Sequence, residues 1–126
     1  MCCRAWNVSC CISLIPSGYN QILMEGSVVL RPIDPNHPIF THASPKGRSF
    51  PMTQINGPML LPRDPSSALA TFDENGQFAA ILAADVGQGR AVAISPHPEL
   101  SVQKDGAEID NSPLLRDAIL WSARQL

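Results

Sequence analysis

Cysteine is absent after residue 11, because all four cysteines lie in the first 11 residues: Cys2, Cys3, Cys10 and Cys11. No disulfide can therefore tie this segment to the rest of the chain. Adjacent cysteine pairs also lack the C-x2-C spacing of zinc sites. Thiols without such spacing are typical of a reduced intracellular chain, and we expect neither a metal nor another cofactor.

Charge is scarce as well, since charged residues make up 16% of the 126 residues and the formal net charge is -2. The sequence thus has no excess of basic residues that would indicate nucleic-acid binding, and no basic run that would indicate binding to a membrane surface. No apolar run is long enough to span a bilayer. The apolar content of 44% is that of a chain that packs a core, and the length fits a single domain.

The first 25 residues differ from those that follow, because they hold every cysteine and show no strand or helix periodicity. Residues 8–16 are apolar and follow Arg4, as in a secretory signal, but the run is short and has no clear cleavage site. A transit peptide would need more basic residues than Arg4 alone. We therefore expect a cytoplasmic protein, with an atypical segment at residues 1–25 and a domain at residues 26–126.

The domain is predicted to be α/β. Residues 27–30 and 91–94 are apolar runs expected to form strands, and the second, apolar throughout, should be covered on both faces. Residues 68–72 and 77–84 should pair as a hairpin, because the Asp-Glu-Asn-Gly turn between them tolerates positive φ.

Prolines and polar runs predict loops elsewhere. Residues 31–40 should be an extended loop because they include three prolines, and residues 41–51 should be exposed. Residues 102–111 are polar and should also form a loop. His37 is then expected in a loop and His42 in solvent.

The last element is predicted to be a helix over residues 113–125, with Ser112 as N-cap and Pro113 at the first helical position. Trp121 follows helical spacing and should pack on the sheet. The polar side chains of this helix should face water: Arg116, Asp117 and Arg124.

The most informative stretch places His97-Pro98-Glu99 just beyond the strand at residues 91–94. Sites in open α/β sheets form at this end of the strands. Pro98 keeps the segment extended, so His97 and Glu99 should project to the same side. A histidine oriented by a carboxylate is the base half of a nucleophilic triad, although such a pair can also be purely structural.

Three segments resemble class I glutamine amidotransferase-like domains, and within them the N-terminal domain of biotin-protein ligases. They are residues 31–40, Ile55-Asn56-Gly57-Pro58, and the Gly-Arg-strand-Ser-Pro-His-Pro-Glu ending at residues 87–100. The resemblance covers residues 26–126 and implies the C-terminal half of a flavodoxin-like mixed sheet. It also implies that His97 is a general base and Glu99 its orienting partner.

The family's cysteine nucleophile sits on a Gly-x-Cys-x-Gly elbow, which this chain lacks, since Cys10 and Cys11 precede Ile12 and Ser13. The main prediction is a truncated, non-catalytic module that binds or regulates, through a protein partner or as a homodimer formed across an uncovered sheet. One alternative is a Cys-His-Glu amidotransferase or hydrolase that uses Cys11 or Cys10. The second is a gene-model remnant without a stable fold. The chain is too short to hold a ligase catalytic domain, so biotin transfer is not assigned to it.

Overall fold

The computed structural model of the chain describes residues 8–10, 26–43, 48–72 and 75–126. Its elements are, in order, β1 (Val8–Cys10), β2 (Gly26–Pro32), η2 (Pro38–Phe40), β3 (Phe50–Gln54), β4 (Leu60–Pro62), η3 (Pro65–Ser67), β5 (Ala68–Phe72), β6 (Asn75–Val86), β7 (Gly89–Ile94), β8 (Val102–Lys104), β9 (Ala107–Ile109) and α2 (Ser112–Ser122).

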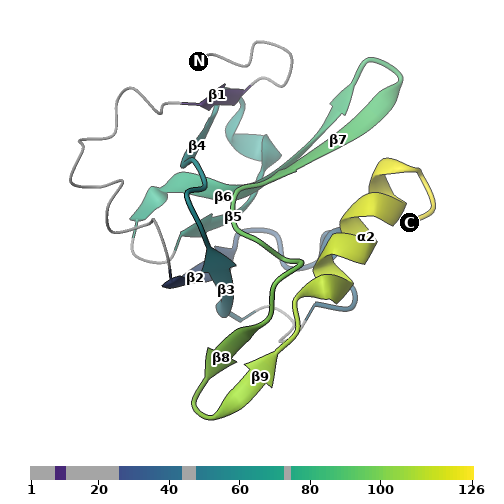
Figure 1. The fold of residues 1–126 in the computed structure, drawn as a ribbon. Helices are drawn as coiled ribbons and strands as arrows, with labels where there is room; N and C mark the ends of the chain where they lie inside the picture. The colour runs from purple at the N-terminus through teal and green to yellow at the C-terminus, as the bar shows by residue number, and fades with distance from the viewer. Residues whose placement is uncertain (1–7, 11–25, 44–47, 73–74) are drawn as a thin grey trace.

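Seven strands form one sheet in the order β1-β4-β6-β5-β2-β3, with β7 paired to β6 beside this path. The pairings between the described strands are antiparallel. Helix α2 lies on one side of the sheet, and the β8–β9 hairpin projects beyond it (Figure 1). The predicted α/β character, hairpin and C-terminal helix are confirmed. The flavodoxin-like arrangement that the resemblance implies stays a prediction.

Strand β6 organises the sheet because its 12 residues are long enough to pair with three strands, β4, β5 and β7. Its first part pairs with β5, which confirms the predicted hairpin, although turn residues 73–74 lie outside the described residues. Its second part pairs with β7 from Ile81↔Ile94 to Val86↔Gly89. Gly87 makes the turn between β6 and β7 at a φ of 59°, which glycine adopts without steric cost.

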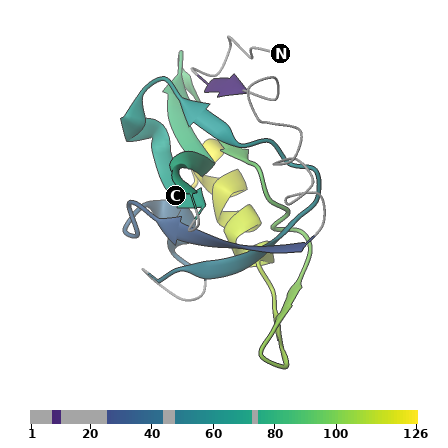
Figure 2. The ribbon, with the colours of Figure 1, turned by 90° about the vertical axis from the view of Figure 1, so that its left-hand side faces the viewer.

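The main core lies between the sheet and α2. In Figure 2 the helix is seen behind β2 and β3. The helix contributes Leu114, Ala118 and Trp121 to the buried side chains. Packed together in this core are Leu30, Ile39, Phe40, Phe50, Met52, Met59, Leu69, Ala70, Phe72, Ala80, Ile81, Ala83, Leu114 and Trp121. Burying one such large apolar side chain stabilises the fold by about 1.5–3 kcal/mol.

Strand β3 corrects the prediction of an exposed segment at residues 41–51. Phe50 and Met52 are two residues apart, so they point to one face, and both are buried against the core. The strand pairs along β2 from Gly26↔Gln54 to Leu30↔Phe50. The sequence did not predict this strand, because Pro51 and the polar residues beside it interrupt the alternation of buried apolar residues.

Two other predicted loops were also wrong. Strand β2 runs on through Pro32, which stands opposite Ala70 of β5. Residues 102–111 hold the β8–β9 hairpin, because Asp105 and Gly106 both take positive φ, at 51° and 79°. Two such residues in succession make the tight turn whose twist suits paired strands.

The ends of α2 differ from those predicted. The N-cap position is Asn111, and the helix starts one residue earlier than expected, at Ser112. The Asp110 carboxylate accepts hydrogen bonds from the backbone N–H and the hydroxyl of Ser112, at 2.9 Å each. The helix ends at Ser122, and Arg124 then takes a φ of 58°. That conformation cannot continue a right-handed helix, which explains the shorter C-terminus.

Two further expectations concern exposure and the N-terminal segment. Strand β7 was expected to be covered on both faces, but it is only half-buried, from Arg90 to Ile94. Within residues 1–25, where no element was predicted, β1 forms three antiparallel pairs with β4, from Val8↔Pro62 to Cys10↔Leu60.

Candidate functional site

The loop that follows β7 crosses from one part of the sheet to another. The backbone N–H of Ser95 donates to the Ala80 carbonyl of β6 at 2.9 Å. Two residues later, the N–H of His97 donates to the Thr53 carbonyl of β3 at 2.8 Å and forms an isolated bridge. Pro96 and Pro98 have no N–H to add to a ladder, so regular pairing stops there.

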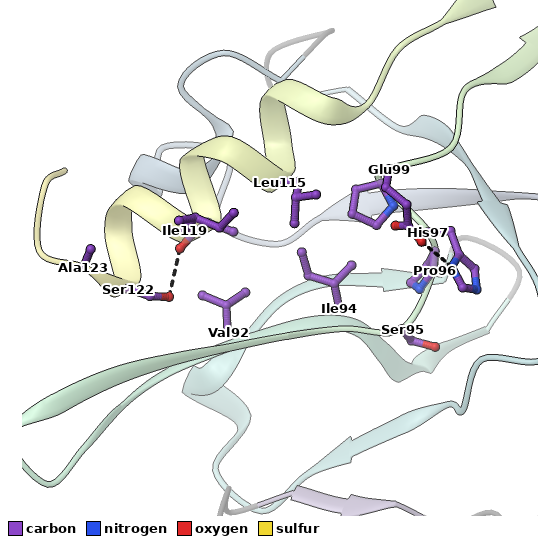
Figure 3. Close-up of a pocket in the computed structure, with 12 residues that line it drawn as sticks. Val92, Ile94, Ser95, Pro96, His97, Glu99, Leu115, Ile119, Ser122 and Ala123 are labelled. Atoms are coloured by element: carbon purple, nitrogen blue, oxygen red, sulfur yellow. Dashed lines mark hydrogen bonds and ion pairs between the residues drawn. The ribbon is translucent and has the colours of Figure 1, made fainter.

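The structure brings His97 and Glu99 together, as their spacing predicted. Nδ1 of His97 lies 2.8 Å from Oε1 of Glu99, and the two side chains meet at one end of a groove (Figure 3). Nε2 of His97 lies 3.0 Å from the carbonyl oxygen of Ile55. The carboxylate therefore orients the ring, and a backbone carbonyl occupies the nitrogen that would face a nucleophile.

These two contacts favour the protonated form of the His97 ring. Both partners are acceptors, so the ring can donate to both only as an imidazolium. The hydrogen bond with Glu99, and next the one with the Ile55 carbonyl, raise the pKa of His97 above its ordinary value, against a smaller opposing effect of burial. The same contact with His97 lowers the pKa of Glu99. A general base needs a free lone pair on Nε2, and here that nitrogen lies 3.0 Å from the Ile55 carbonyl oxygen instead.

Two of the segments that carry the family resemblance meet at this place. We call the contact between residues 55–58 and residues 95–99 the His97 junction. Besides the His97–Ile55 contact, the Ser95 hydroxyl donates to the Pro58 carbonyl. Asn56 takes a φ of 51°, which turns the chain at the junction.

Gly57 allows the two segments of the junction to approach. A Cβ at this position would lie 2.5 Å from the Ser95 carbonyl oxygen and still closer to the Gln54 amide nitrogen. Real Cβ atoms do not come that close, so only glycine fits here without displacing backbone. The Asn-Gly pair was singled out by resemblance alone, and the structure supplies its physical reason.

Gln54 lies beside the His97 junction and was missed in the sequence. It is 1% exposed, and its amide nitrogen donates to the Gly57 carbonyl at 3.0 Å. Its Oε1 atom has no hydrogen-bond partner among the described residues. A buried glutamine at the end of a strand gives no signal in the sequence, because its burial depends on which loop folds over it.

The cysteines cannot be placed against His97. The backbone of Cys10 lies in β1 opposite Leu60, and its side chain is outside the described part of the chain. Cys11 lies outside the described residues, as do Cys2 and Cys3. Their candidacy as nucleophiles therefore stays a prediction.

A groove of about 550 Å³ runs between β7 and α2 and ends at the His97 junction (Figure 3). One wall is formed by Val92 and Ile94 of β7, and the other by Leu115 and Ile119 of α2, so the middle of the groove is apolar. Ile119 is 60% exposed. The complete lining is Val92, Ile94, Ser95, Pro96, His97, Pro98, Glu99, Leu115, Ala118, Ile119, Ser122 and Ala123.

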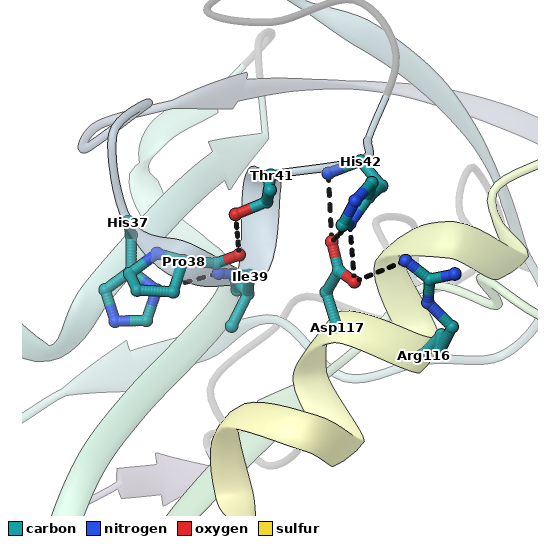
Figure 4. A network of polar contacts seen from close by, with 7 residues as sticks. All are labelled: His37, Pro38, Ile39, Thr41, His42, Arg116 and Asp117. Carbon is teal, nitrogen blue, oxygen red and sulfur yellow. Dashed lines mark hydrogen bonds and ion pairs between the residues drawn. The ribbon is translucent and has the colours of Figure 1, made fainter. Parts of the chain in front are cut away.

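A second histidine–carboxylate pair joins His42 to Asp117 of α2 (Figure 4). Asp117 was expected to face water but is fully buried. Its carboxylate accepts the backbone N–H of His42 at 2.9 Å, lies 3.0 Å from Nδ1 of the same residue, and accepts Nη2 of Arg116 at 3.3 Å. Burial alone would raise the pKa of Asp117, but the contacts with His42 and Arg116 outweigh it and leave the pKa lowered. The pair fastens the segment after η2 to the helix.

The expectations for His37, Trp121 and the two arginines of the C-terminal segment hold. His37 caps η2, with Nδ1 accepting the N–H of Ile39 at 3.3 Å. Trp121 is in the core as expected, with the His37 ring 5.0 Å from its ring and the guanidinium of Arg90 4.7 Å from its centroid. Burial lowers the pKa of His37. Arg116 and Arg124 are more than half exposed, as predicted.

Over the described residues, no three histidine, cysteine or acidic side chains gather where they could hold a metal ion. Among those residues, no helix is long and apolar enough to cross a membrane. Comparisons of the chain with protein-family models, with curated proteins and with solved structures found no match.

Proposed function

We propose that this chain is a non-catalytic binding module, built as the C-terminal half of a flavodoxin-like, class I glutamine amidotransferase-like domain of the biotin-protein ligase N-terminal kind. One observation carries the proposal. Nε2 of His97 is held against the Ile55 carbonyl rather than left open to a nucleophile. A base whose working nitrogen is bound to backbone cannot take a proton from a thiol until that contact breaks.

The His97 junction gives the histidine and glutamate another role, which is structural. Together with Ser95 and Gly57 they join the loop after β7 to the turn after β3. This joint closes one end of the apolar groove. The groove offers a surface of suitable chemistry for a protein partner, since exposed apolar walls gain free energy when another apolar surface covers them.

The proposal is tested by an assay for ammonia release from glutamine, run beside an assay of ester hydrolysis. We expect neither activity above that of buffer, and no change on substitution of His97→Ala or Cys11→Ser. Ammonia release that is lost in both variants would overturn the proposal.

The alternative, a Cys-His-Glu hydrolase or amidotransferase, is favoured by one observation, the 2.8 Å contact that orients His97 through Glu99. It requires Cys11 or Cys10 to be a reactive thiolate. The thiolate is the nucleophilic form, so the alternative expects one cysteine to react with iodoacetamide far faster than the others at neutral pH. The binding-module proposal expects similar rates at all four cysteines. His97→Gln is the matched control, because it should slow the fast cysteine only if the two side chains work together.

A further inference from the structure

The three histidines of the chain differ in which ring nitrogen is open to solvent. In His97 both nitrogens lie within hydrogen-bond distance of an acceptor, Oε1 of Glu99 and the Ile55 carbonyl oxygen. In His37, Nδ1 accepts the N–H of Ile39, so the proton of the neutral ring is on Nε2. Neither ring therefore presents a free lone pair to a reagent in solution.

The third histidine, His42, has an open outer nitrogen. Its Nδ1 lies 3.0 Å from both oxygens of the Asp117 carboxylate. The pKa of Asp117 is lowered, so this carboxylate is ionised at neutral pH and can only accept. Nδ1 therefore carries the proton of the neutral ring, and Nε2 keeps the lone pair. Among the described residues nothing is hydrogen-bonded to that Nε2, and the side chain is 51% exposed.

The His42 ring is also held in one orientation (Figure 4). The carboxylate that contacts the ring accepts the backbone N–H of the same residue at 2.9 Å. Asp117 is fully buried on α2, so its carboxylate stays directed at His42 rather than at solvent. A buried aspartate placed in this way orients a histidine and stabilises the positive charge that the ring gains when its outer nitrogen reacts.

A cationic side chain contacts the same carboxylate. Nη2 of Arg116 lies 3.3 Å from Oδ1 of Asp117, one of the two oxygens that face the His42 ring (Figure 4). The Arg116 side chain is 58% exposed, so it can bring further N–H donors to a group bound at the ring. A guanidinium pairs with phosphoryl oxygens through parallel hydrogen bonds. An anionic phosphoryl group therefore suits this place better than a neutral acyl group.

From this arrangement we infer that His42 is a phosphoryl-acceptor site, whose Nε2 takes a phosphoryl group from a small phosphoramidate donor. The Nε2 lone pair attacks phosphorus and forms the new N–P bond, while the N–P bond of the donor breaks and its electron pair leaves with ammonia. The proton on Nδ1 stays in place, so the ring becomes positively charged opposite the Asp117 carboxylate. Arg116 pairs with the phosphoryl oxygens. This inference goes beyond the binding role proposed above and does not depend on it.

The first test is incubation of the whole chain with phosphoramidate at neutral pH, followed by mass spectrometry of its peptides without acid, which would hydrolyse the N–P bond. We expect His42 to be phosphorylated about tenfold faster than His37 or His97, because each of those rings must first give up a hydrogen bond. NMR of the phosphorylated ring distinguishes Nε2 from Nδ1. Equal labelling of the three histidines, or a phosphoryl group on Nδ1 of His42, would overturn the inference.

The second test concerns Arg116. Arg116→Gln should slow the labelling of His42 by about two- to fivefold, the effect of an exposed ion pair, and Arg116→Lys should restore part of the rate because it keeps the charge. Arg124→Gln is the matched control, since Arg124 is 53% exposed and contacts Gln88 and Asp85 rather than Asp117. A rate that Arg116→Gln leaves unchanged, or that Arg124→Gln lowers equally, contradicts the role of the guanidinium.

The third test removes the charge opposite the ring. In Asp117→Asn the labelling of His42 should fall to the rate of His37 and His97, because no carboxylate stabilises the positively charged ring. The reaction is run below the melting temperature of the variant, so that loss of the fold is not the cause. A folded Asp117→Asn variant whose His42 is labelled as fast as in the wild type refutes the inference.

Discussion

Removing the Asp117 carboxylate should destabilise the fold more than the removal of any other acidic side chain described above. Asp117 is fully buried and receives the backbone N–H of His42 at 2.9 Å, besides ring and guanidinium contacts. A hydrogen bond to a charged group contributes about 1.5–3 kcal/mol. The contacts of His42 and Arg116 from exposed side chains add about 0–1 kcal/mol each.

We therefore expect Asp117→Ala to cost about 3 kcal/mol of unfolding free energy. At about 4 °C per kcal/mol for a chain of this size, the melting temperature should fall by about 12 °C. Asp117→Asn keeps an oxygen for the His42 N–H but loses the charge. Its melting temperature should therefore fall by about half as much as that of Asp117→Ala. Arg116→Ala is the control, and its cost should stay below about 0.5 kcal/mol because that side chain is exposed.

Acid provides an independent check. The pKa of Asp117 is lowered by folding, so its stabilisation is present above the unfolded value of 3.8 and is lost as the pH falls through the lower folded value. The wild type should lose stability below about pH 4 more steeply than Asp117→Asn. Circular dichroism melts with urea titrations measure both effects. An Asp117→Ala cost equal to that of Arg116→Ala would refute the reasoning, and a broad melt without a cooperative transition would favour the remnant hypothesis.

Three further outcomes follow from the junction and the core. Folding raises the pKa of His97, so its stabilisation is present below pH 6.5 and is lost as the pH rises through the higher folded value. The difference in unfolding free energy between wild type and His97→Gln, measured by urea titration, should therefore shrink as the pH is raised above 6.5, and a constant difference contradicts this. Gly57→Ala should lower the free energy of unfolding, measured by urea titration, by about 1–3 kcal/mol. Gly76→Ala should lower it less, because the added Cβ meets nothing within 4 Å. Equal losses in the two variants would disprove the close packing at Gly57. Trp121→Ala should cost about 3–5 kcal/mol in a thermal melt, and a cost below about 1 kcal/mol would show that the ring is not part of the core.

The candidate site was only partly predictable. His97 and Glu99 could be paired from the sequence, because two residues around a proline in an extended segment project to one side. Their contact with Ile55 could not, since it joins residues 42 positions apart. That long-range contact changes the interpretation of the pair, from a general base with a free Nε2 to a histidine that is bonded to backbone.

The His42–Asp117 pair shows the same limit more strongly. Its members are 75 positions apart, and each alone resembles an ordinary surface residue. Asp117 was placed on the solvent side of α2 because charged helical residues usually lie there. The segment after η2 folds over this part of the helix and brings the backbone N–H and the ring Nδ1 of His42 to the carboxylate. Arg116 adds a third hydrogen bond from its guanidinium. The carboxylate can be buried because these partners replace water.

By itself the sequence determined the local elements with strong short-range signals. These are the β5–β6 hairpin, the β6–β7 turn at Gly87, the core position of Trp121 and the C-terminal helix. Turn residues and periodicity act over a few residues, so they can be read without a fold. Only the tertiary structure decided the rest: that β3 is a buried strand, that Asp117 is internal, that His97 is fastened to Ile55, and that β7 keeps one edge unpaired among the described strands. Each of these depends on which distant segment comes to lie against the residue, and composition and spacing do not encode that choice locally.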